Sequence, residues 1–130
     1  HQDLRDRAVT SWLAAAHLPG DTGLVTYGQA QVLEASGLRP GYPYLWSLPA
    51  RTLDPDLHRL ARRLHASAGP DWVVVWLPVD TWGLDPYGLV TKELTRHYRR
   101  VATVCDVPIY LKGGEYRSLP PVPSGCTVTP

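Results

Sequence analysis

The chain has 130 residues, a length that suits one domain able to bury a core of its own without metals or many crosslinks. Its formal net charge is +1, from 13 basic and 12 acidic residues scattered along the chain, so the sequence does not predict nucleic-acid binding. No segment approaches the roughly 20 apolar residues that cross a bilayer, and the start lacks a signal-peptide pattern. Because it begins at His1 and contains no methionine, it is either a processed product or a piece excised from a longer protein, and the second is favoured.

The first part of the chain predicts a helix followed by a loop. Residues 3–16 repeat apolar side chains at helical spacing from Leu4 to Ala16. A proline and two glycines within residues 18–23 then break the helix. The spacing of these glycines matches neither a dinucleotide-binding motif nor a P-loop, so no phosphate-binding loop is predicted.

The next stretch combines a strand, a glycine turn, a helix and an aromatic run. Residues 24–27 include two β-branched residues and a tyrosine, which predicts a strand, and Gly28 allows a sharp turn into a helix over residues 29–36. Gly37 is placed to end this helix as a C-terminal cap. Three aromatic residues follow within five positions, stiffened by prolines, and form either a packed lid over the sheet or a platform for a ligand: Tyr42, Tyr44 and Trp46.

Helices and strands continue to alternate in the second half. Asp54–Pro55 predicts the capped start of a long helix that Gly69–Pro70 ends. Residues 72–77 form a continuous apolar run, which is typical of a central strand covered on both faces. Asp85–Pro86 repeats the capped start, and predicts a third helix whose apolar register includes Tyr87, Val90, Leu94 and Tyr98.

The last elements predict a hairpin and a tail. Residues 101–105 and 109–111 have strand character and are joined through residues 106–108, which favours an antiparallel hairpin at one end of the sheet. The whole pattern predicts an α/β fold: one compact, three-layer-like domain with a short mixed sheet of four or five strands, flanking helices and this C-terminal hairpin. We expect residues 1–118 to form the domain and residues 119–130 to form a proline-rich, extended tail.

Among the carboxylates, Asp80 is the candidate for a functional role. It follows the predicted core strand, between Pro78 and Trp82, where α/β sheets place loops that contact ligands. Asp54, Asp56 and Asp85 are better explained by the Asp-Pro helix starts than by acid/base chemistry.

Histidine and cysteine spacing predicts neither a metal site nor a cofactor. His58 and His65 lie seven residues apart on one helix, about 10 Å, too far to share one metal, and are expected on the surface. Cys105 and Cys126 lack the spacing of a zinc site and the context of a nucleophile. They form either one disulfide in an oxidising compartment or two unrelated buried thiols.

The aromatic residues form the candidate ligand-binding set. Flat rings beside hydroxyl and indole donors suit sugars and lipid head groups, and packing in the core is the alternative. With Asp80, the predicted ligand-binding residues are Tyr27, Tyr42, Tyr44, Trp46 and Trp82.

A series of short segments between residues 20 and 113 follows an order known from one family. The first half contains Tyr27-Gly28, Val32-Leu33, residues 36–40 and residues 42–46; the second contains residues 72–77, the Tyr-Arg-x-Val of residues 98–101, residues 104–106 and residues 109–111. Together they resemble the signature that follows the membrane part of many bacterial GT-C-type glycosyltransferases, in particular actinobacterial-like membrane proteins. These are polytopic enzymes that use polyprenyl-phosphate-linked sugars.

The resemblance implies the C-terminal domain of a multi-span membrane protein, facing the extracytoplasmic side, which a Cys105–Cys126 disulfide would fit. In such enzymes the catalytic acid lies in an early extracytoplasmic loop that this chain lacks, so no catalytic residue is carried over. The domain is expected to shape the acceptor entrance or to pack on the membrane portion of the same polypeptide, and to contact a glycan or lipid-linked sugar. The alternatives are an autonomous carbohydrate- or cell-wall-binding module and a small soluble α/β enzyme that uses Asp80.

Overall fold

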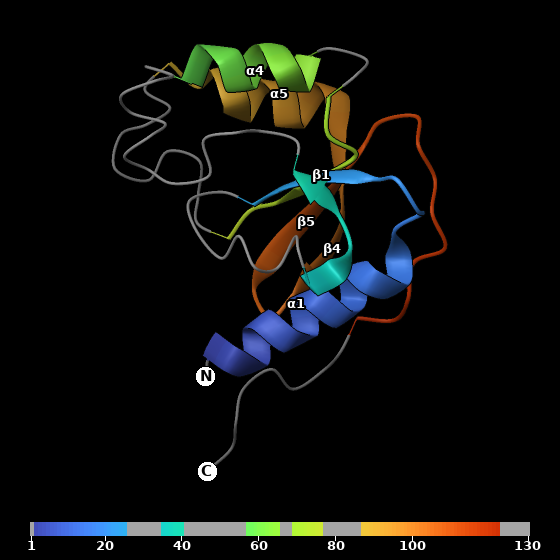
Figure 1. The fold of residues 1–130 in the computed structure, drawn as a ribbon. Helices are drawn as coiled ribbons and strands as arrows, with labels where there is room; N and C mark the ends of the chain where they lie inside the picture. The colour runs from blue at the N-terminus through green and yellow to red at the C-terminus, as the bar shows by residue number, and fades with distance from the viewer. Residues whose placement is uncertain (1, 26–34, 41–56, 66–68, 77–86, 123–130) are drawn as a thin grey trace.

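The computed structural model describes residues 2–25, 35–40, 57–65, 69–76 and 87–122. A five-stranded mixed sheet lies between two layers of helices (Figure 1). Helix α1 (Gln2–Ala16) covers one face of the sheet, and helices α4 (His58–His65) and α5 (Leu89–His97) lie side by side on the other. The predicted α/β class, with a mixed sheet and flanking helices, is confirmed.

The strand order of the sheet is β2-β1-β3-β5-β4. Strand β1 (Thr22–Val25) pairs in parallel with β2 (Arg39–Pro40) and with β3 (Trp72–Val74). Strand β5 (Val107–Lys112) runs antiparallel to β3 and to β4 (Tyr98–Val104). The amino ends of β1 and β3 therefore lie beside the carboxyl end of β5, and the candidate site is at this end of the strands.

Side chains of the central strands alternate between two cores. Leu24 and Val73 pack with α4 and α5, whereas Val25, Trp72 and Val74 pack with α1. All five are at most 2% exposed. The apolar run after residue 71 is thus a central strand covered on both faces, as predicted, although its strand pairing ends at Val74.

A β-bulge redirects the side chains of β4. The pairing with β5 shifts register between Arg100 and Ala102. Tyr98 belongs to the core beneath α4 and α5, whereas Ala102 and Val104 belong to the core beneath α1. In an uninterrupted strand these three residues would share one face, so the extra residue carries the end of β4 to the opposite core.

The C-terminal hairpin is confirmed, but its turn lies earlier than predicted. Cys105 and Asp106 connect the strands, with φ angles of 52° and 65°. Two positive φ angles are characteristic of the tight hairpin turn that matches strand twist. Val107 and Pro108 already pair with β4, so the expected connection through residues 106–108 is wrong.

The start predicted for the third helix is also wrong. Gly88 is the N-cap of α5, with φ 65° and ψ 24°, and it makes no side-chain capping bond. This left-handed backbone is not helical, so the helix begins only at Leu89. Tyr87 lies before the helix and is 68% exposed, and Tyr98 begins β4.

Helix α1 and the end of the helix expected over residues 29–36 agree with the sequence, whereas Leu57, expected inside the second helix, has φ 57° and lies before it. Helix α1 buries Val9, Trp12 and Leu13, as its spacing predicts. Of the helix expected over residues 29–36 the structure describes the last two residues, which are helical, followed by Gly37 at φ 86°, as a C-terminal cap requires. The predicted start of the second helix, residues 54–55, lies outside the described residues, and α4 spans His58–His65.

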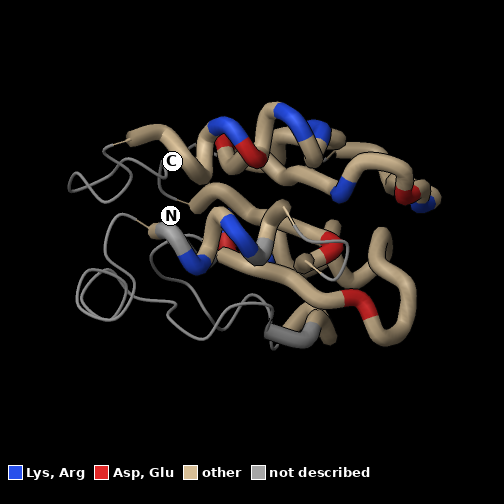
Figure 2. The backbone as a smooth tube through the Cα atoms, turned by 90° about the horizontal axis from the view of Figure 1, so that it is seen from above, with Lys and Arg blue, Asp and Glu red and all other residues tan. Residues whose placement is uncertain are grey.

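Charges of both signs are mixed over the described part of the molecule. Figure 2 shows Lys and Arg positions interspersed with Asp and Glu along the backbone. Helices α4 and α5 are an exception, because Arg59, Arg62, Lys92 and Arg96 are exposed there and Glu93 is their sole acidic residue. No described helix combines the length and apolar character that a membrane span needs.

Candidate functional site

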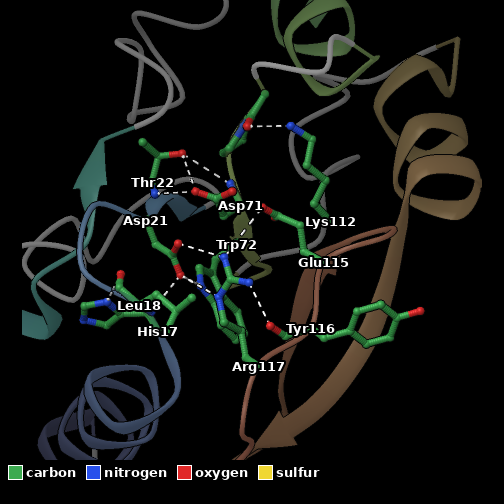
Figure 3. A network of polar contacts seen from close by, with 12 residues as sticks. His17, Leu18, Asp21, Thr22, Asp71, Trp72, Lys112, Glu115, Tyr116 and Arg117 are labelled. Carbon is green, nitrogen blue, oxygen red and sulfur yellow. Dashed lines mark hydrogen bonds and ion pairs between the residues drawn. The ribbon is translucent and has the colours of Figure 1, made fainter.

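Two acidic residues stand at the amino ends of neighbouring strands. Asp21 directly precedes β1, and Asp71 directly precedes β3. Because β1 and β3 are parallel neighbours, both residues lie at the same end of the strands. Strand β5 brings Lys112 there, with its backbone N 2.9 Å from Asp71 O, and the following chain turns back with Glu115 and Arg117 (Figure 3).

Asp21 and Arg117 form a buried, bidentate ion pair. Arg117 donates from Nη2 to Oδ1 of Asp21 at 2.8 Å and from Nε to Oδ2 at 3.0 Å, and both side chains are 8% exposed. Oδ2 also accepts from Trp72 Nε1 and from Leu18 N, each at 2.9 Å. Burial acts to raise the pKa of Asp21, but the hydrogen bonds from Arg117, Trp72 and Leu18 outweigh it, so the pKa lies below its usual value.

Asp71 and Glu115 bring two carboxyl groups together. Asp71 accepts at Oδ2 from Thr22 N at 2.9 Å. Burial raises the pKa of Glu115, and so do a hydrogen bond with Asp71 and the charge of Asp71. Oε2 of Glu115 is buried and receives no hydrogen bond from the described residues. This arrangement disfavours the ionised form of Glu115.

These groups line an open pocket of ≈ 570 Å³. Lys112 reaches along its wall and donates from Nζ to the backbone oxygen of Gly69 at 3.0 Å. The pocket thus offers carboxyl oxygens, an ammonium group and a glycine turn without side chains. Such groups bind the hydroxyls of a polar ligand, and a protonated carboxyl can also exchange a proton. The residues that line the pocket are Thr22, Gly69, Asp71, Lys112, Gly113, Gly114 and Glu115.

Glu115→Gln is expected to raise the melting temperature at pH 7 by a few degrees. A raised carboxyl pKa means that the folded protein keeps a proton that the unfolded chain has lost, so ionisation of Glu115 works against folding at neutral pH. Stability contributed by this group increases as the pH falls from 7 toward its ordinary pKa of 4.5. The glutamine amide donates to Asp71 at every pH, so the variant should lose this increase. Thermal melts at pH 5 and pH 7 measure it, and an unchanged pH dependence would contradict the raised pKa of Glu115.

The ligand-binding residues predicted from the sequence are not among those the structure describes. This holds for Tyr27, Tyr42, Tyr44, Trp46, Asp80 and Trp82, whose roles stay predictions. Cys105 is disulfide-bonded, and there is no free cysteine in the part of the chain that the structure describes. Cys126, the other cysteine of the sequence, also lies outside the described residues.

Sequence reasoning missed the polar residues that meet at the amino ends of β1 and β3. Asp21 and Arg117 are separated by 96 positions, and Thr22 and Asp71 by 49. One signal was present, because an acidic residue stands directly before each of two apolar strands. That these strands are parallel neighbours, however, is decided by the pairing of the sheet and not by local sequence.

A second polar cluster among the described residues has the composition of a metal site. His65 of α4 and Glu93 and His97 of α5 each offer a ligand atom, and the three atoms lie within 4.8 Å of one another. This cluster lies on helices α4 and α5 and not at the amino ends of β1 and β3, so it is separate from the pocket.

Fold and site together define an α/β domain with a polar pocket at the amino edge of its parallel strands. Comparison of the chain with protein-family models, with curated proteins and with solved structures finds no match.

Proposed function

We propose that this chain is the extracytoplasmic, non-catalytic domain of a membrane-embedded glycosyltransferase that uses a polyprenyl-phosphate-linked sugar. Its main partner is the membrane portion of the same polypeptide, which supplies the catalytic acid. Within this enzyme the pocket around Asp71 and Glu115 binds hydroxyl groups of the acceptor.

The observation that carries the proposal is the correspondence between the family-like segments and the elements of the fold. The family pattern runs from a strand through a helix with a Ser-Gly turn to an apolar strand, a helix and a Tyr-Arg-x-Val strand that opens a hairpin. The described elements follow this order, with β1, the helix end at Ser36, β3, α5 and the β4–β5 hairpin that Tyr98 begins. All these strands belong to one sheet, so the pattern corresponds to one folding unit.

The state of Cys105 supports the extracytoplasmic location. This residue sits in the hairpin turn and is disulfide-bonded. Disulfides persist in oxidising compartments and are rare in the reducing cytosol. A domain on the outer face of the cell membrane meets that condition.

The chemistry of the pocket supports contact with a hydroxyl-rich ligand. Sugar hydroxyls donate to carboxylate oxygens and accept from an ammonium group, and both kinds of group line the pocket around Asp71, Glu115 and Lys112. Gly114 leaves the adjacent turn open for close approach of a ring, because no atom lies within 4 Å of the place where its Cβ would stand.

The location can be tested in the full-length polypeptide with Tyr116→Cys, since Tyr116 is 78% exposed. We expect a membrane-impermeant maleimide to label the introduced cysteine equally in intact and in permeabilised cells. Val73→Cys is the matched control, because Val73 is 0% exposed and a folded domain should protect the new thiol. The unsubstituted full-length protein gives the background labelling to subtract, and the 130-residue chain alone should gain the mass of two hydrogens on reduction. Labelling of Tyr116→Cys only after permeabilisation would overturn the proposed location.

The acceptor role can be tested by sugar transfer in membranes that contain the full-length protein. Asp71→Asn with Glu115→Gln is expected to raise the acceptor KM about tenfold or more while kcat is kept, since each removes an ionisable hydrogen-bonding partner. Lys92→Gln, an exposed change on α5, should leave both constants unaltered. Unchanged kinetics in the double variant would remove the pocket from acceptor binding. Saccharide binding by the isolated domain would instead favour an autonomous binding module, and turnover by it that Asp80→Asn abolishes would favour a soluble enzyme.

A further inference from the structure

A His-Glu-His cluster joins the two helices that cover one face of the sheet. Oε2 of Glu93 lies 3.2 Å from Nδ1 of His65 and 3.2 Å from Nε2 of His97. The two imidazole rings stand at 87° to each other, with their centroids 4.8 Å apart. One carboxylate oxygen and two imidazole nitrogens therefore converge on a single point between α4 and α5.

The backbone on both sides of the cluster is held in place. His65 follows Leu64, which is 0% exposed, and Glu93 precedes Leu94, which is 6% exposed; both leucines belong to the core between the helices and the sheet. The backbone oxygen of His97 accepts from Gly113 N at 2.7 Å, which ties the end of α5 to the sheet. The three side chains thus start from rigid positions, as a preorganised site requires.

The distances fit the coordination of a transition metal. Zinc binds imidazole nitrogen and carboxylate oxygen at about 2.0–2.2 Å, and tetrahedral geometry then separates neighbouring ligand atoms by about 3.3 Å. Both nitrogen-to-oxygen distances agree with this value. The remaining separation of at most 4.8 Å, between the two histidine nitrogens, can close by rotation of His65, whose side chain is 67% exposed.

The charges around the cluster are consistent with a site for one divalent ion of moderate affinity. Glu93 is the sole acidic residue of α4 and α5, and its side chain is 17% exposed. Arg59, Arg62, Lys92 and Arg96 are exposed on the same helices. Repulsion from these groups lowers the affinity for any divalent ion, while the single carboxylate disfavours Ca²⁺, which needs several, and the two imidazoles suit zinc.

We propose that His65, Glu93 and His97 bind Zn²⁺ and that the ion clamps α4 to α5. Three protein ligands leave a fourth coordination position for water or for a group from a partner. The sequence shows only half of this site, Glu93 and His97 four positions apart on one helix, because His65 comes from another helix and stands 28 positions before Glu93. The proposal is independent of the proposed function.

Thermal unfolding of the 130-residue chain tests the site, with EDTA-treated protein compared before and after addition of ZnCl₂. A ligand that binds only the folded state raises its stability, and we expect a Tm increase of about 5–10 °C near saturation. Binding of Co²⁺ should give the visible absorption of a tetrahedral ion. If Zn²⁺ leaves the Tm of the unsubstituted protein unchanged, the three residues form only a hydrogen-bonded cluster and the proposal is wrong.

Substitutions assign the ion to this cluster. His65→Ala should abolish the zinc-dependent shift and leave the metal-free Tm nearly unaltered, because this side chain is largely exposed. Glu93→Gln should weaken zinc binding at least about tenfold, since it removes the anionic ligand. His17→Gln is the control, because this histidine lies after α1, with Nε2 2.6 Å from Ser36 O, and should keep the full shift. A shift retained in His65→Ala would assign zinc to other histidines and overturn the proposal.

Discussion

Arg117→Met is expected to lower the free energy of unfolding by about 3–5 kcal/mol, because it leaves a buried carboxylate without its partner. Arg117 supplies two of the four hydrogen bonds that Asp21 accepts, and both side chains are 8% exposed. Methionine keeps much of the side-chain length but cannot neutralise the charge. Urea denaturation at pH 7 followed by circular dichroism gives the change in stability.

The double variant Asp21→Asn with Arg117→Met measures how much of the stability depends on the interaction between these two side chains. Because Asp21→Asn removes the charge that Arg117→Met leaves uncompensated, we expect the double variant to lose much less stability than the sum of the single variants. Additive losses would mean that the two side chains stabilise the fold independently.

The same pair predicts a dependence on pH. The pKa of Asp21 is lowered in the folded protein, so its stabilising contribution is present above the ordinary value of 3.8 and is lost as the pH falls through the folded pKa. In Arg117→Met the main hydrogen-bonding cause of that lowered pKa is gone. The variant should therefore lose stability at a higher pH than the unsubstituted protein does, and identical acid-unfolding profiles would contradict this assignment.

Trp72→Ala is expected to cost about 3–5 kcal/mol, enough to unfold much of a domain of marginal stability. Trp72 is 0% exposed in the middle strand of the sheet, and its ring stands edge-on to Trp12 with centroids 5.9 Å apart. Alanine leaves a large cavity between β3 and α1 and also removes a donor from Asp21. Denaturation followed by far-ultraviolet circular dichroism measures the loss without relying on tryptophan fluorescence.

Trp72→Phe is the matched control for the cavity. Phenylalanine fills most of the volume but lacks the indole N–H that donates to Asp21, so we expect a loss of about 1–3 kcal/mol. If the alanine and phenylalanine variants were equally stable, the hydrogen bond and not the packing would be the main contribution of Trp72.

The parts of the fold predicted correctly are those that depend on neighbours in sequence. Helical spacing in residues 3–16 gave α1, and the unbroken apolar run that begins at Trp72 gave the central strand. Two predictions made from local sequence, the start of α5 and the position of the hairpin turn, were wrong. Asp85–Pro86 has the composition of a helix start, yet the left-handed backbone of Gly88 delays α5 to Leu89. The Cys105–Asp106 turn lacks the Asn-Gly signature of its turn type, so the hairpin was placed correctly but its turn was not.

The sequence by itself determined the α/β class, the alternation of elements and the absence of a strong net charge, because periodicity and composition are local properties. Only the tertiary structure decided which polar side chains meet. Strand pairing brings Asp21, Asp71 and Lys112 to the same end of the strands. The chain after β5 then adds Arg117. Packing of α4 against α5 likewise brings His65 to Glu93 and His97. Both clusters are assembled from residues far apart in sequence, and the burial of the two apolar cores fixes their positions.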